Sequence, residues 1–168
     1  MFPIKPWDKV DINHLFITSN MLSKHVTLDD FKLLSVIGKG SYAKVVLVKK
    51  NDSDKTYAMK ILKKKHIEKK KQEAHIMTER NVLVEVDHPF VIKMYASFQS
   101  PEKLFFILEF CPGGELFGLL SKKHKLSEEQ TKFYAAQMVL ALEYLHARDI
   151  IYREYMIINI VSNHKTFS

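Results

Sequence analysis

The sequence predicts an α+β fold in which a five-stranded antiparallel sheet with one major helix precedes the first helices of a helical second part. Runs rich in β-branched and aromatic residues, separated by turn residues, occupy most of residues 26–110. One helical pattern interrupts these runs at residues 71–86. After a glycine-containing break at residues 111–114, helical patterns replace the strand patterns.

Composition limits the classes of protein that the chain can represent. Its 168 residues, 46% of them hydrophobic, suit one domain with a substantial core. No stretch is apolar for long enough to span a bilayer, and residues 1–11 lack the features of a secretory signal. A lone cysteine, Cys111, excludes an internal disulfide and a metal site built on several thiolates. We therefore expect a cytoplasmic protein.

Positive charge is concentrated in one short segment. The formal net charge is +7, and six lysines lie between Lys63 and Lys71 in KKKHIEKKK. A solvated loop or helix start is the favoured interpretation, and a nuclear localisation signal or phosphate-docking patch is the alternative. Nucleic-acid binding is not expected, because no aromatic residue is interleaved with these lysines for base stacking.

The first strands follow a segment without periodicity. Residues 1–25 are expected to form an extended leader that packs on the domain in places. Three strands are then expected at FKLLSVIGKG, VVLVKK and KTYAMKILK, with a turn at residues 51–54 between the last two.

The helical pattern at residues 71–86 ends at His88-Pro89 and places a mixed set of side chains on one face. That face carries Ile76, Glu79, Leu83 and Val86. Two further strands, IKMYASF and KLFFILEF, complete the predicted sheet.

Two helices are expected after the break, at about residues 115–122 and 127–147, with Ser127 near the cap of the second. The residues FYAAQMVLALEYL would place apolar side chains on almost every side of this helix, which is typical of a helix buried on several sides. Little sequence follows that could cover this helix, so we expect the chain to stop before its second core is complete.

A glycine-rich stretch lies between the first two predicted strands. Residues 38–43 read G-x-G-x-x-A, but a dinucleotide-binding fingerprint would lead into a helix. A glycine-rich hairpin can instead lay backbone N–H groups over a phosphate chain. A plain hairpin turn is the alternative.

One predicted strand carries a lysine beside a small residue. Strand alternation puts Ala58 and Lys60 on one face, which Val45 can share. The alanine and valine would make a flat apolar roof for an adenine ring, and the lysine would supply charge for phosphate. A surface lysine in a lysine-rich chain is the alternative.

Glu79 interrupts the apolar face of its predicted helix. A carboxylate in such a place is costly unless a cation meets it, and Lys60 is the candidate cation. Alternatively, the inward face tolerates one partly exposed glutamate.

The sequence resembles the protein kinase family in the order of four features. These are the glycine hairpin, the strand lysine, the helix glutamate and the glycine linker. The segments GKGSYAKV, YAMKIL, HPFVIKMYASFQ, LFFILEF, GGELF, FYAAQMVLALEYLH and IIYR are similar to the AGC group, the first of them to atypical protein kinase C. The resemblance covers about residues 26–153. It implies an N-lobe at 26–110, a hinge at 111–114, the start of a C-lobe at 115–168, and Mg-ATP-dependent phosphorylation of protein serine or threonine.

The resemblance also implies a set of ATP-binding residues. These residues are Ile37, Gly38, Lys39, Gly40, Ser41, Tyr42, Ala43, Val45, Ala58, Lys60, Glu79, Leu108, Glu109, Cys111 and Glu115. Gly38, Gly40 and Ala43 would form the phosphate lid. Lys60 would hold the α- and β-phosphates and pair with Glu79.

The remaining implied roles concern the adenine and ribose. Val45 and Ala58 would cover the adenine ring, and Leu108 would be the gatekeeper. Glu109 and Cys111 would offer hinge backbone groups to the adenine edge. Glu115 would reach the ribose or a basic substrate residue.

The catalytic loop departs from the family pattern. The AGC group has Y-R-D-L-K-P-E-N where residues 152–159 read YREYMIIN. Glu154 stands at the position of the catalytic aspartate, and misplacing a carboxylate by about 1 Å can cost about a hundredfold in rate. Met156 replaces the phosphate-neutralising lysine, while Asn159 matches the magnesium-binding asparagine by position.

No D-F-G, activation loop or A-P-E follows in this sequence. We therefore expect these 168 residues to bind nucleotide better than they transfer phosphate. Agreement with the family ends abruptly after Arg153, which favours a truncated reading frame or a retained intron over gradual decay.

Three functional interpretations remain open from the sequence. The chain is part of an active kinase whose other half is absent here, or a pseudokinase-like module that binds nucleotide or a partner kinase. The helix at residues 127–147 would then be the partner surface. The third interpretation is a truncation product without function, which would aggregate through the same helix.

Overall fold

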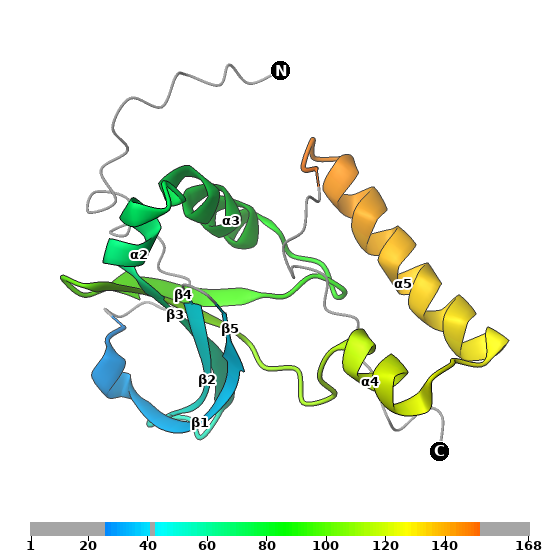
Figure 1. Ribbon diagram of the computed structural model, residues 1–168, viewed down its shortest axis with the longest axis horizontal. Coiled ribbons are helices and arrows are strands. Elements are labelled where there is room, and N and C mark those ends of the chain that lie inside the picture. Colours follow the sequence, from blue (N-terminus) through cyan, green and yellow to red (C-terminus); the bar gives the residue numbers. More distant parts are fainter. Residues whose placement is uncertain (1–25, 41–42, 152–168) are drawn as a thin grey trace. The chain divides into compact units, whose positions relative to one another are not determined.

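The computed structural model describes residues 26–40 and 43–151, which form two compact units (Figure 1). Within the described residues, the first unit comprises residues 26–84 and 94–109, and the second comprises residues 85–93 and 110–151. Residues 85–93 thus group with the second unit although they precede a strand of the first.

The first unit contains a five-stranded antiparallel sheet with strand order β1-β2-β3-β5-β4. Its strands are β1 (Phe31–Lys39), β2 (Ala43–Lys50), β3 (Thr56–Lys63), β4 (Met94–Gln99) and β5 (Lys103–Glu109). A short 3-10 helix, η1 (Leu28–Asp30), precedes β1. The predicted antiparallel sheet is confirmed, because each strand run in the sequence becomes one strand.

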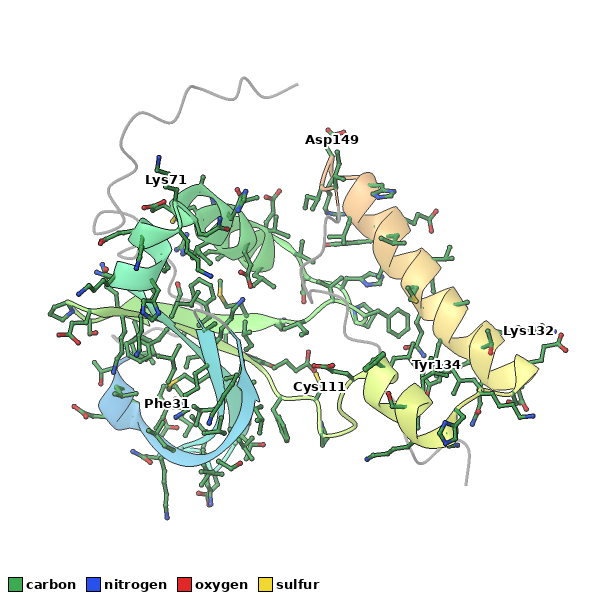
Figure 2. The ribbon with its side chains drawn as sticks, viewed as in Figure 1. Phe31, Lys71, Cys111, Lys132, Tyr134 and Asp149 are labelled. Atoms are coloured by element: carbon green, nitrogen blue, oxygen red, sulfur yellow. The ribbon has the colours of Figure 1, made fainter. Side chains whose placement is uncertain are left out.

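One face of the sheet, here called the aromatic face, carries a hydrophobic core. Its buried members are Phe31, Val46, Val48, Tyr57, Met59, Ala96, Phe105 and Ile107. Phe31 lies within the curl of the strands, edge-on to Tyr57 at 6.3 Å and stacked on Phe98 at 6.5 Å between ring centroids (Figure 2). Aromatic pairs of this kind add about 0.5–1.5 kcal/mol each beyond the area that they bury.

The opposite face, here called the lysine face, packs against the major helix. That helix, α3 (Glu73–Glu85), buries Ile76 and Leu83, as the helical pattern predicted. Arg80 of α3 donates from Nε to Ser97 Oγ at 3.3 Å, so a buried polar contact also ties the helix to β4. Burial lowers the pKa of the Arg80 guanidinium from its ordinary value.

The lysine run forms a separate short helix, α2 (Lys64–Lys69), which follows β3 directly. Its first residue, Lys64, is buried and donates from Nζ to Gln99 Oε1 at 2.7 Å. Ile67 is completely buried. We expected the lysine run at residues 63–71 to be solvated. Only part of it is, because Lys64 and Ile67 pack into the first unit.

The second unit contains α4 (Leu116–Lys123) and α5 (Glu128–His146). Tyr144 of α5 accepts at its hydroxyl from the Asp87 N–H at 3.2 Å, and its ring lies 4.7 Å from that of His88. Arg148 covers the Tyr144 ring at 3.6 Å. These contacts explain why residues 85–93 belong to this unit. Among the described residues, no helix combines the length and apolar character that crossing a membrane needs.

A capping box begins α5. The Ser127 hydroxyl accepts from the Gln130 N–H at 3.1 Å, and Gln130 Oε1 accepts from the Ser127 N–H at 3.2 Å. We expect Ser127→Ala to lower the free energy of unfolding by about 1 kcal/mol, because one backbone N–H loses its acceptor. Urea denaturation of the full chain measures this loss, with Ser121→Ala of the exposed α4 surface as the control. Equal midpoints for the two variants would contradict the prediction.

Candidate functional site

The hairpin between β1 and β2 carries two glycines, Gly38 and Gly40. The Gly40 N–H donates to Ala43 O at 2.8 Å, and Gly38 lies opposite Val45. A Cβ on Gly38 would meet Val45 at 3.5 Å, and a Cβ on Gly40 would meet Ala43 O at 3.6 Å, both ordinary contacts without left-handed backbone. As far as the described residues go, the hairpin therefore has room for a Cβ at both positions. Glycine is instead suited to the close approach of a ligand to the backbone.

The structure describes two of the other residues implied in the phosphate lid, Ile37 and Lys39. The side chain of Ile37 is 46% exposed, and Lys39 pairs with Lys44 across the hairpin. Ser41 and Tyr42 lie outside the described residues.

The strand register brings the predicted roof residues onto the lysine face. Val45 lies opposite Lys60, and Ala58 lies opposite both Leu47 and Leu108. Residues opposite each other in an antiparallel ladder share a face. Leu47, two residues beyond Val45, belongs to the same surface, and strand alternation from Val45 was the signal that could have identified it. Together these side chains make an apolar surface next to a lysine.

Lys60 and Glu79 form an ion pair across the lysine face. Lys60 Nζ lies 2.5 Å from Glu79 Oε1, as the sequence suggested for the carboxylate in the apolar stripe. The side chain of Glu79 is only 7% exposed, whereas that of Lys60 is 21% exposed. An ammonium group has three N–H donors, so Lys60 keeps donors and solvent access for a further anion. Glu79 Oε2 is buried without a hydrogen-bond partner among the described residues.

The helix α3 holds Glu79 in place through its neighbours. Ile76 and Leu83, one turn to either side, are each 3% exposed, and Arg80 is fixed to Ser97. The carboxylate therefore sits on a packed helix, which restricts Lys60 to one position. Sequence reasoning did not identify Arg80, because its partner lies 17 residues away on another strand.

Two of the implied residues belong to the second unit. The Gly114 N–H donates to Cys111 O at 3.1 Å, and Gly114 adopts a φ of +72°, which favours glycine. Glu115 is the N-cap residue of α4, with an exposed side chain that makes no capping hydrogen bond. Leu108 and Glu109 end β5 in the first unit, and both are half-buried.

The residues implied in phosphoryl transfer and magnesium binding are not placed. Glu154 and Asn159 lie outside the described residues. Within the described part, no cluster of three His, Cys, Asp or Glu side chains could hold a metal ion. Phosphate binding by Lys60 and the magnesium site therefore both stay predictions.

Comparison with known proteins identifies the class. A family model described as the protein kinase domain matches residues 31–167, which is most of the chain. The chain belongs to the protein kinase family and covers the N-terminal part of the domain.

Curated relatives place the chain more narrowly among serine/threonine kinases of the AGC group. It is 49% identical to Protein kinase 3 of Dictyostelium discoideum over 78% of this chain and 14% of that protein. It is 46% identical to a RAC family serine/threonine-protein kinase homolog of the same organism, over 79% of this chain and 30% of the relative. It is 45% identical to the serine/threonine-protein kinase sgk-1 of Caenorhabditis elegans, over 86% and 31%. The chain thus spans less than a third of each of these three relatives.

Proposed function

We propose that the chain binds Mg-ATP as the nucleotide-binding part of an AGC-type serine/threonine protein kinase, and that these 168 residues do not transfer phosphate by themselves. The relatives are named as serine/threonine kinases, and the described residues supply a surface that suits a nucleotide. The ion pair between Lys60 and Glu79 carries the proposal, because a buried carboxylate holds the end of a lysine side chain that is itself partly exposed.

Each described residue has a task in this proposal. Ala58, with Val45 and Leu47, offers an apolar surface to the adenine ring. Lys60 binds the α- and β-phosphates as a point charge, and Glu79 holds Lys60 in position. The backbone at Gly38 and Gly40 can approach the phosphate chain because glycine carries no side chain of its own.

When bound, ATP supplies the phosphoryl group and the magnesium ion neutralises its charge. Glu154 and Asn159 are the residues that would serve the reacting end. The glutamate, longer than aspartate by one methylene, and Met156, which carries no charge, support the proposal that transfer fails in this chain.

The test is nucleotide binding by the purified 168-residue chain, followed as the shift in melting temperature with ATP and magnesium. We expect a shift that saturates with ATP, since any ligand of the folded state stabilises it. Lys60→Ala should abolish this shift, because the phosphates lose their charged partner. Each variant is compared with its own ATP-free melting temperature, which separates binding from stability.

The matched control is Lys55→Ala, which removes an exposed lysine ahead of β3. This variant should keep the full ATP-dependent shift. An ATP shift that survives Lys60→Ala, or a wild-type chain without any shift, would contradict the proposal. A kinase assay on the wild-type chain tests the second half of it, and measurable phosphate transfer would overturn that half.

A partner-binding module is the second candidate, and the surface of α5 favours it. Val139 is 62% exposed, Leu140 is 47% exposed and Met138 is 38% exposed. Three consecutive exposed apolar side chains are unusual on a helix surface that faces solvent. They are typical of a surface that contacts another protein. Co-purification of a kinase with the wild-type chain, lost in Val139→Ser, would support this candidate.

A further inference from the structure

The core of the aromatic face is open at one edge. Leu33 lies opposite Val48, and Val36 lies opposite Val46, so both side chains point to the aromatic face. Val46 and Val48 are 4% and 0% exposed, whereas Leu33 and Val36 are 52% and 44% exposed. These two residues of β1, here called the open rim, extend the core to a surface that the described residues do not cover.

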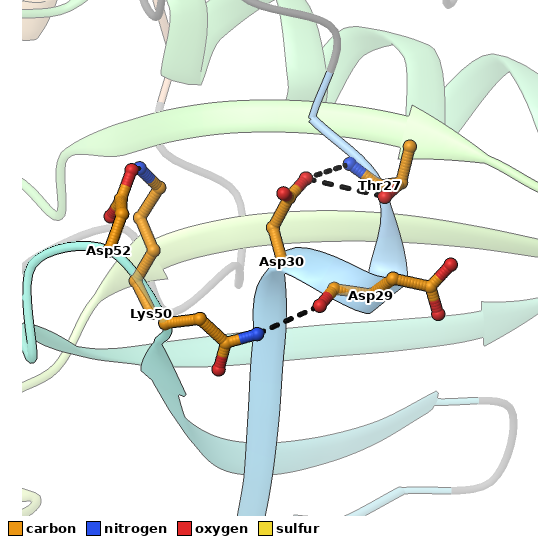
Figure 3. Close-up of polar contacts among 6 residues, drawn as sticks. Thr27, Asp29, Asp30, Lys50 and Asp52 are labelled. Carbon is orange, nitrogen blue, oxygen red and sulfur yellow. Dashed lines mark hydrogen bonds and ion pairs between the residues drawn. The ribbon is translucent and has the colours of Figure 1, made fainter.

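The chain that precedes β1 is anchored beside this rim. Asp30 Oδ2 accepts from the Thr27 N–H at 2.7 Å, which closes η1 on itself (Figure 3). Asn51 then fixes η1 to the turn after β2, donating from Nδ2 to Asp29 O at 2.8 Å and from its N–H to Asp30 O at 2.9 Å. Several hydrogen bonds therefore hold the described chain in place between Thr27 and the start of β1.

Packing at the start of the described chain already follows the aromatic face. Val26, the residue next to the leader, is half-buried against the core cluster that contains Phe31, Val46 and Val48. The first described residue, Val26, thus lies on the face that carries the open rim.

The amino-acid composition of the leader, residues 1–25, favours burial of its side chains against other residues. Ten large apolar residues besides Met1 lie in residues 1–25: Phe2, Ile4, Trp7, Val10, Ile12, Leu15, Phe16, Ile17, Met21 and Leu22. Three lysines and two aspartates leave little net charge. Segments that remain solvated are usually poor in such side chains and richer in charge.

The leader is also long enough to reach the rim. Val36 lies about 17 Å along β1 from Phe31, at roughly 3.3 Å per residue. The residues between Ile17 and Val26 can span about 30 Å when extended. A tethered segment acts at an effective concentration in the millimolar range, which favours it over a second copy of the chain.

We propose that the apolar residues of the leader between Val10 and Ile17 pack on the open rim and complete the core of the aromatic face. The occupant is this segment of the same chain. This inference is independent of nucleotide binding, because the rim lies on the face opposite to Lys60.

Hydrogen exchange of the full 168-residue chain tests the proposal. We expect amides within residues 10–17 to exchange more slowly than in an unstructured segment. The double variant Leu33→Ser with Val36→Thr should speed their exchange about tenfold or more, because the apolar contact that holds the leader is lost. Phe117→Ser is the control, since this side chain is 75% exposed in the second unit and its loss should leave residues 10–17 unchanged.

Two further measurements keep the test decisive. In the first, hydrogen exchange of the β5 amides reports whether the rim variant still folds. In the second, the reciprocal variant Leu15→Ser with Ile17→Ser changes the leader and leaves the residues of the sheet unaltered. The reciprocal variant should speed exchange at residues 33–36.

Three outcomes would overturn the proposal. The first is a leader that exchanges freely in the wild-type chain. The second is protection that neither double variant changes while β5 stays protected. The third is protection that rises with protein concentration together with a dimeric mass, which would identify a second copy as the occupant.

Discussion

Phe106→Ala is expected to lower the free energy of unfolding by about 3–5 kcal/mol. Phe106 is completely buried in the central part of the sheet, where β5 pairs with both β3 and β4. Its removal leaves a cavity lined by elements that the ladders hold in place, so the site cannot collapse to fill the space. Urea denaturation of the full chain measures the loss.

Phe117→Ala is the matched control for this substitution. The same side chain is removed, but Phe117 is 75% exposed on α4, so the free energy of unfolding should change by less than about 0.5 kcal/mol. A loss below about 1 kcal/mol for Phe106→Ala would show that the sheet repacks around the cavity. It would also contradict a rigid core beneath Lys60, which lies opposite Phe106 in the ladder.

Lys60→Met is expected to destabilise the chain by about 1–3 kcal/mol, because it leaves the Glu79 carboxylate buried without a cation. Fully buried pairs lose about 3–5 kcal/mol when one partner is removed. The smaller value is expected here because the Lys60 side chain is 21% exposed and solvent screens part of the interaction. Adding Glu79→Leu in the same chain should recover most of the loss, since the buried charge is then gone.

A double-mutant cycle on these variants isolates the coupling between the two side chains. The control cycle uses Lys132 and Glu128, which form an ion pair of 2.7 Å on the surface of α5 with 75% and 83% exposed side chains. Their coupling should be close to zero. Equal coupling free energies for the two pairs would contradict the expectation that burial of Glu79 strengthens its coupling with Lys60.

The two cycles also bear on function. A buried ion pair is weak evidence for stability, because apolar replacements of similar volume often stabilise a protein as well or better. If Lys60→Met with Glu79→Leu is as stable as the wild-type chain yet shows no ATP-dependent shift, the pair serves ligand binding. That result is expected from the partial exposure of Lys60 and from the two glycines of the neighbouring hairpin.

Much of the first unit follows from local sequence patterns. Alternation along a strand has a period of two, so the facing of Val45, Ala58 and Lys60 could be predicted without knowing the partner strands. The apolar repeat of α3 likewise placed Glu79 among buried residues, and electrostatics then required a nearby cation. The pairing with Lys60 was accordingly predictable as chemistry, before its distance was known.

Other features depend on contacts between distant residues. The lysine run gives no sign that Lys64 is buried, because its partner Gln99 lies 35 positions away. The same holds for Arg80 and Ser97, and for the contact of Asp87 with Tyr144, which places residues 85–93 in the second unit. Sequence periodicity carries no information about such long-range pairs.

The open rim shows where the two kinds of information separate. The residue pattern predicted a strand at β1, and the order of the glycines, Lys60 and Glu79 indicated the protein kinase family. In contrast, the exposure of Leu33 and Val36 opposite the buried Val46 and Val48 could be seen only in the packed sheet. The physical reason is that a strand pattern sets which face a side chain takes, whereas burial depends on which other segments cover that face.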